Sequence, residues 1–102
     1  NRVVVDAGQK SLTLFTNFFN PQPPPPHYGY IVEYPEAKMR GMFVEHGIVD
    51  VSACKHKFKV GERLSVIPVH QEMTLNLHDE LVGVRGGKVE VIWPVAARGK
   101  TR

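Results

Sequence analysis

The chain has 102 residues, of which 42% are hydrophobic and 23% are charged, with a formal net charge of +3. This length suits one small domain, and the composition excludes a disordered tail, which would be poorer in apolar residues. No apolar run approaches the ~18 residues of a membrane span. The single cysteine, Cys54, excludes an intrachain disulfide framework and a CxxC zinc site.

The basic residues do not form the pattern of a nucleic-acid binder. Thirteen Lys and Arg are interspersed with ten Asp and Glu, and the dense basic clusters are 55–59 and 98–102. A nucleic-acid binder concentrates charge on one face beside stacking aromatics. We therefore interpret both clusters as solvated loop and tail residues and expect neither a nucleic-acid nor a membrane partner.

The beginning of the chain carries no visible targeting signal. It opens at Asn1, without a methionine or an apolar h-region. We therefore expect a cytoplasmic protein, and the opening directly into strand-like sequence suggests a segment of a longer chain.

Short, alternating apolar runs predict β-strands. In chain order these runs are 3–5, 30–34, 38–44, 48–51, 64–67, 81–85 and 88–93. Gly86-Gly87 between the last two predicts a hairpin, because primed turns need positive φ at both central residues. No segment of ten or more residues has clear 3.6-residue spacing. The sequence therefore predicts an all-β fold, a small barrel or sandwich of about seven mostly antiparallel strands.

Residues 17–27 break this pattern. They contain Pro21 and the run Pro23–Pro26, and proline removes amide donors and fixes φ, which excludes a central strand or a helix. We interpret the segment as a stiff surface loop, with a polyproline II ligand as the alternative. No internal boundary is visible, so residues 1–102 are expected to form one domain.

The richest polar stretch is 68–79. In an extended segment His70 and Glu72 would point to the same side, and an imidazole and a carboxylate can grip one divalent cation such as zinc or manganese. Two ligands leave positions for water or substrate, which is a catalytic arrangement. The H-x-E pattern alone is weak, and ordinary surface residues are the alternative.

Other chemistry finds little support. Cys54 has no assignable partner histidine, and the chain lacks a nucleophile-elbow serine and a glycine-rich phosphate loop. Glu45-His46 is either an acid–base pair or a polar turn between two strands.

Six spans occur in an order typical of one family: Val5–Lys10, Glu45–Gly47, Val60–Leu64, Ile67–Glu72, Thr74–Leu77 and Ala97–Gly99. Together they resemble the C-terminal β-domain of the D-threonine aldolase and D-serine dehydratase family, whose members are pyridoxal-phosphate enzymes of the alanine-racemase type. The resemblance covers nearly the whole chain apart from the Pro-rich insert. It implies the C-terminal domain of a larger barrel-plus-β-domain enzyme, whose catalytic TIM-like barrel is not in this chain.

The resemblance also implies cofactors and partners. Pyridoxal phosphate would be held by the barrel, so no residue here is expected to bind it, and this part alone would be inactive. The partners would be the chain's own N-terminal barrel domain, a second copy in a homodimer, and a small D-amino-acid substrate.

The family's metal motif reads H-x-C or H-x-D. His70 falls on its histidine and Glu72 on the Cys/Asp position, where cysteine goes with zinc in dehydratase-like members and aspartate with manganese-type ions in aldolase-like members. Glutamate keeps an oxygen ligand but adds a methylene, which favours the aldolase branch. Glu45, His46 and Asn76 are expected to support the ligands or contact another domain.

The function implied is that of a lyase of D-amino acid metabolism. The metal would act as a Lewis acid on the substrate β-hydroxyl while the cofactor stabilises a carbanion at Cα. The outcome is either D-threonine aldolase-like cleavage or D-serine dehydratase-like elimination. The alternatives are a stand-alone β-barrel module that binds a protein or nucleic acid through the Pro-rich loop or the basic clusters, and a family-like domain that lost its metal.

Overall fold

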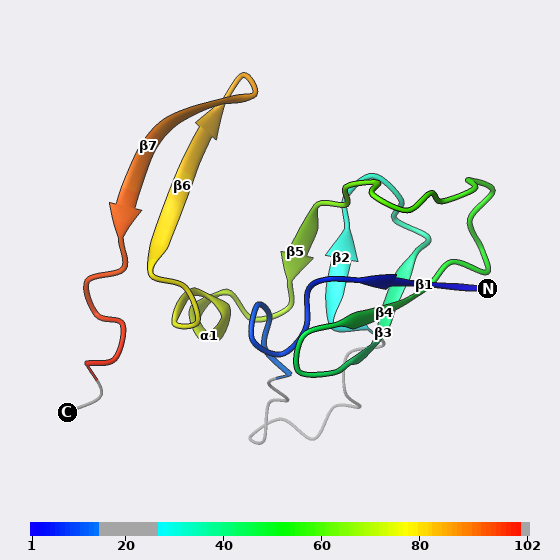
Figure 1. Cartoon of the computed structure of the whole chain (residues 1–102), viewed down its shortest axis with the longest axis horizontal. Helices are drawn as coiled ribbons and strands as arrows, with labels where there is room; N and C mark the ends of the chain where they lie inside the picture. The colour runs from blue at the N-terminus through cyan, green and yellow to red at the C-terminus, as the bar shows by residue number, and fades with distance from the viewer. Residues whose placement is uncertain (15–26, 101–102) are drawn as a thin grey trace.

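The computed structural model describes residues 1–14 and 27–100 (Figure 1). These residues form, in chain order, β1 (Arg2–Val5), β2 (Gly29–Ile31), β3 (Lys38–Met42), β4 (Gly47–Asp50), β5 (Val66–Pro68), α1 (Gln71–Leu75), β6 (Glu80–Arg85) and β7 (Lys88–Pro94). The predicted all-β class and the number of strands are confirmed. The predicted Pro-rich loop, apart from His27, lies outside the described residues.

The seven strands are divided between two antiparallel sheets. Five form one sheet in the order β1-β4-β3-β2-β5, and β6 and β7 form a separate two-stranded sheet. In Figure 1 the β6–β7 hairpin stands away from the five-stranded sheet, with α1 between the two. The five-stranded sheet therefore carries the core, and α1 occupies the junction.

The core lies on one face of the larger sheet. Strands β2 and β4 alternate between buried and less buried positions, as expected for a sheet with one packed face. The buried hydrophobic residues are Leu12, Ile31, Ala37, Met39, Met42 and Val49. Half-buried side chains of β1 and β5, among them Val3, Val5 and Val66, pack against this cluster and extend it to both edge strands.

The segment after β1 is locked onto the turn between β3 and β4. The N–H groups of Gln9 and Lys10 donate to the carbonyls of Phe43 and Val44 at 2.8 and 3.1 Å. A Cβ added at Gly8 would lie 2.4 Å from the Phe43 carbonyl oxygen, so only glycine fits there.

The hairpin turn has the predicted geometry. Gly86 and Gly87 have φ of 57° and 76°, the positive values that a type I′ turn requires. No helix among the described residues is long and apolar enough to cross a membrane.

Candidate metal site at the start of helix α1

The chain turns into a short helix directly after the predicted histidine ligand. His70 is the N-cap of α1, with extended dihedral angles (φ −132°, ψ 101°). Its Nδ1 accepts a hydrogen bond from the Met73 N–H at 3.4 Å, and Thr74 Oγ1 donates to the His70 carbonyl at 2.8 Å. The expectation of an extended segment is therefore wrong for residues 71–75, because these two bonds stabilise a helical turn.

The helical turn nevertheless brings the two predicted ligands together. His70 Nδ1 lies 3.2 Å from Glu72 Oε2, and the two side chains are 29% and 82% exposed. The one in-plane lone pair of Nδ1 can accept the Met73 N–H or bind a cation, but not both at once. A metal ion between Nδ1 and Glu72 Oε2 would therefore replace the hydrogen bond from Met73. Two ligand atoms each about 2.1 Å from one ion, at an angle of about 100°, would lie about 3.2 Å apart. The spacing and the donor types therefore fit a small divalent cation.

The protein supplies two ligand atoms at this place. Over residues 1–14 and 27–100, no group of three or more His, Cys, Asp or Glu side chains is arranged to hold a metal ion. An ion bound by His70 and Glu72 would therefore keep several positions for water or another ligand, as ions with a catalytic role do.

The other three predicted site residues lie in two different places. Asn76 is the C-cap of α1, and its backbone N–H donates to the Glu72 carbonyl at 3.2 Å. Glu45 and His46 lie in the turn between β3 and β4, where Glu45 Oε1 pairs with Lys10 Nζ at 2.5 Å. Asn76 thus shares the helix of the candidate ligands, whereas Glu45 contacts the segment that follows β1.

A second polar cluster, which no sequence motif indicated, surrounds Glu62. Glu62 accepts hydrogen bonds from His56 Nε2 at 2.8 Å, from Tyr34 Oη at 3.0 Å and from the Lys59 N–H at 3.1 Å. The His56 ring stacks on Tyr34 with centroids 4.7 Å apart, and Phe58 packs edge-on against both rings. The cluster attaches the loop after β4 to the β2–β3 turn. In the sequence, the only indication of this cluster is the dense mixture of His, Phe and Glu in that loop.

Two pKa shifts follow from this cluster. The hydrogen bond from His56, followed by that from the Lys59 N–H, lowers the pKa of Glu62. Burial, followed by the hydrogen bond to Glu62, raises the pKa of Tyr34. The cluster therefore holds Glu62 as a carboxylate and Tyr34 as a neutral phenol.

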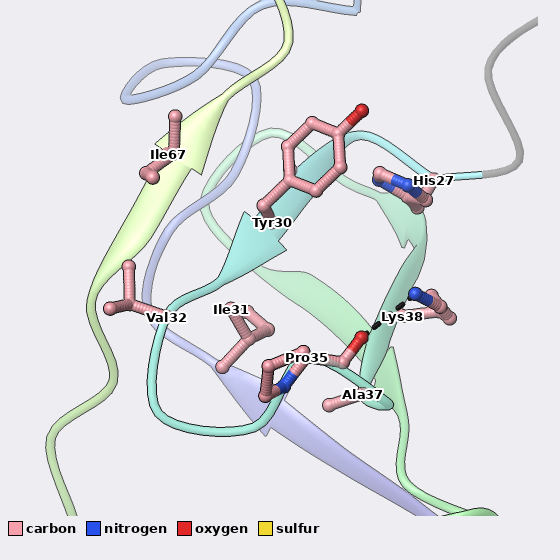
Figure 2. A pocket seen from close by; sticks show the side chains of 9 residues that line it. His27, Tyr30, Ile31, Val32, Pro35, Ala37, Lys38 and Ile67 are labelled. Carbon is pink, nitrogen blue, oxygen red and sulfur yellow. Dashed lines mark hydrogen bonds between the residues drawn. The ribbon is translucent and has the colours of Figure 1, made fainter.

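A separate cavity of about 290 Å³ lies beside β2 (Figure 2). Tyr30, Pro35, Lys38 and Ile67 line it, together with His27, which is 6% exposed. The His27 Nδ1 has no hydrogen-bond partner in the described part of the chain, and burial, followed by the charge of Lys38, lowers the His27 pKa. No residue of α1 lines this cavity.

The arrangement thus defines a β-domain with a two-residue candidate metal site at the junction of its sheets. A family model described as "Putative serine dehydratase domain" matches residues 1–84. The chain belongs to this family, and the predicted resemblance to the D-threonine aldolase and D-serine dehydratase family is confirmed.

Named relatives agree with this assignment. The chain is 38% identical over 102 residues to a D-threonine aldolase of Arthrobacter sp., covering 100% of this chain and 24% of the relative. It is 50% identical over 56 residues to a 3-hydroxy-D-aspartate aldolase of Paracoccus denitrificans, covering 55% of this chain and 14% of the relative.

A solved structure shows the same fold. The crystal structure of a D-threonine aldolase from Filomicrobium marinum matches 99% of this chain and 25% of that chain, with a TM-score of 0.81 and 31% identity. The chain thus spans a quarter or less of the length of these relatives.

Proposed function

We propose that this chain is the C-terminal β-domain of a pyridoxal-phosphate-dependent lyase that cleaves D-β-hydroxy amino acids in an aldolase reaction. The names of two relatives, D-threonine aldolase and 3-hydroxy-D-aspartate aldolase, denote enzymes whose substrates carry a hydroxyl on Cβ. The rest of such an enzyme would hold the cofactor in a barrel domain and associate as a homodimer.

The contact between His70 Nδ1 and Glu72 Oε2 carries the proposal for this chain. Its spacing and donor set fit a divalent cation, with manganese favoured over zinc because one ligand is a carboxylate oxygen. When bound, the metal would polarise a substrate hydroxyl as a Lewis acid, and pyridoxal phosphate would stabilise negative charge at Cα.

The residues of this chain would hold and orient that ion. The backbone of His70 is positioned by the Thr74 hydroxyl, which donates to the His70 carbonyl, and Glu72 lies on the first turn of α1. Because Glu72 is largely exposed, the remaining coordination positions would face outward, where a substrate hydroxyl from a neighbouring domain could reach them.

The metal site is tested on the full-length protein by Mn²⁺ binding, measured by electron paramagnetic resonance, and by aldolase activity before and after chelation. Glu72→Gln removes a charged oxygen ligand and is expected to weaken Mn²⁺ binding at least about tenfold. Glu72→Asp keeps the carboxylate and is expected to retain binding. Glu80→Gln, a matched change of an exposed glutamate on β6, is the control. Equal Mn²⁺ affinity in Glu72→Gln and the parent would contradict the proposal.

A dehydratase reaction is the second candidate, because the matching family model carries the serine dehydratase name. Of the features on which the stand-alone binding module depends, the basic cluster 55–59 lies in the loop that Glu62 holds, and the Pro-rich loop, apart from His27, lies outside the described residues. Membership of an enzyme family favours the lyase domain over that module.

A further inference from the structure

The β6–β7 hairpin carries apolar side chains on both of its faces. In the strand register Val82 lies opposite Ile92, and Val84 opposite Val89, which places four aliphatic side chains on one face. Leu81 and Trp93 are paired on the other face. A surface strand with one packed face alternates apolar and polar residues, whereas a strand covered on both faces is apolar throughout.

The ring of Trp93 occupies the space that the missing side chain of Gly83 leaves on the second face. A Cβ added at Gly83 would come within 2.9 Å of Trp93 Cζ3, so the indole ring lies directly against this glycine. Trp93 is nonetheless 52% exposed. Tryptophan is one of the residues that most often dominate the free energy of interfaces.

Nothing in the described part of the chain covers either face. There β6 and β7 pack closely only with each other, and Figure 1 shows the hairpin projecting from the rest of the fold. Val84 and Val89 are 62% and 61% exposed. Because an isolated two-stranded hairpin is marginally stable in water, these faces need a partner.

The base of the hairpin is tied to its surroundings. The Val95 N–H donates to the Asp79 carbonyl at 2.8 Å, and Arg98 forms an ion pair with Asp79. The ring of His78 contacts the Ser11 carbonyl through Nε2 at 2.9 Å. The first two contacts close the base of the hairpin itself, and the contact between His78 and Ser11 links that base to the segment after β1.

The charge of the hairpin and the length of a related protein indicate what kind of partner covers the two faces. The charged side chains near the tip, Arg85, Lys88 and Glu90, nearly balance, and Arg85 pairs with Glu90 at 3.0 Å, so the faces themselves offer apolar contact. The Filomicrobium marinum structure matches 99% of this chain, hairpin included, although the match covers only 25% of that chain. A relative about four times as long thus keeps this arrangement, with most of its polypeptide available to cover the hairpin.

We propose that the hairpin inserts into the larger part of the same polypeptide in the full-length enzyme, and that this part packs against both faces of the hairpin. This inference rests on the proposed function for the existence of that larger part. Its test does not depend on metal binding or catalysis, so the two proposals fail separately.

Photo-crosslinking on the full-length protein tests the partner. A benzophenone amino acid is placed at Val84 on one face and at Trp93 on the other, in protein assembled from a mixture of light and heavy isotope-labelled chains. Peptide mass spectrometry is expected to find cross-links from both positions to residues outside 1–102. The two peptides joined by each cross-link should carry the same isotope label. Mixed-label cross-links, which would identify a second copy, or cross-links confined to residues 1–102, would overturn the proposal.

A matched pair of variants gives an independent measurement. Val84→Lys is expected to lower the midpoint of thermal unfolding of the full-length protein by several degrees, because a charge would be buried. Val4→Lys changes an equally exposed valine of β1, at 60% against 62% for Val84, and is expected to shift the midpoint by about 1 °C or less. Equal shifts in the two variants would contradict the insertion of the hairpin.

Discussion

At the scale of single residues, His70 has two roles that depend on each other. It caps α1 through Nδ1 and its carbonyl, and the same Nδ1 faces the Glu72 carboxylate. Because Nδ1 has one in-plane lone pair, a metal ion bound there would replace the cap hydrogen bond, so metal binding and the start of α1 are coupled.

This coupling predicts the effect of Thr74. Thr74→Val removes the hydroxyl that donates to the His70 carbonyl, a hydrogen bond worth about 1 kcal/mol. We expect Mn²⁺ affinity to fall about fivefold, whereas Thr74→Ser, which keeps the hydroxyl, should retain it. Titration of the full-length variants by electron paramagnetic resonance measures both. A loss of the same size in Thr74→Ser would show that side-chain packing, and not the hydroxyl, positions His70.

The sequence predicted the proximity of His70 and Glu72 but assigned it to the wrong backbone. Spacing of two residues juxtaposes side chains in a strand, and here a capped helical turn achieves the same result. The capping bonds are local, yet a histidine N-cap is outside the usual Ser, Thr, Asp and Asn set. The pattern therefore predicted that these two side chains lie close together without predicting α1.

At the scale of the elements, the loop between β4 and β5 depends on one carboxylate. The lowered pKa of Glu62 means that its charged form is stabilised in the folded state. This contribution is present above the ordinary Glu pKa of 4.5 and is lost as the pH falls through the lowered value.

Glu62→Gln is therefore expected to lower the thermal unfolding midpoint of the full-length protein at pH 7. The difference from the parent should shrink as the pH falls below 4.5, the ordinary value for Glu. Scanning calorimetry across this pH range measures the effect, with Glu36→Gln in the β2–β3 turn as the control. A difference that does not change with pH would assign the effect to packing instead of charge.

The lock between Gly8 and the β3–β4 turn gives a second prediction for an element. Gly8→Ala forces its Cβ to 2.4 Å from a backbone oxygen and is expected to destabilise the protein by about 3 kcal/mol, as overpacking does. In Gly41→Ala the nearest atom would be 3.6 Å away, so the change should cost about 1 kcal/mol or less. Chemical denaturation of both full-length variants checks this order, and equal destabilisation would contradict the lock.

Most elements were predictable because their signals are local. The alternating runs located every strand, and Gly86-Gly87 identified the only two-residue hairpin turn with positive φ at both positions in residues 1–14 and 27–100. The Tyr34–His56–Glu62 cluster was not predictable, because it joins residues from separate segments whose contact depends on the folded sheet.

At the scale of the whole molecule, the test of the proposed function is the product of the reaction. The proposed function predicts that the full-length enzyme converts D-threonine to glycine and an aldehyde. Chromatographic product analysis with D-threonine and D-serine tests this. Ammonia and a 2-oxo acid as the main products would instead assign the dehydratase reaction.

The fold class followed from periodicity, but the division into five and two strands did not. The alternation of apolar and polar residues along a strand indicates whether the strand has a packed face, but it does not indicate which strands are neighbours. The order β1-β4-β3-β2-β5 depends on contacts between distant segments, and so does the separation of the hairpin.

That strand order also determines how the sheet closes during folding. Strands β3 and β4, and likewise β6 and β7, are joined by short turns and can pair early. Strand β1 has to wait for β4, since Arg2 pairs with Asp50, and β2 has to wait for β5, since Tyr30 pairs with Ile67. Distant pairings of this kind slow folding. The core around Met39 and Val49 is complete only when both edge strands have joined, so we expect these two distant pairings to slow the folding of the sheet.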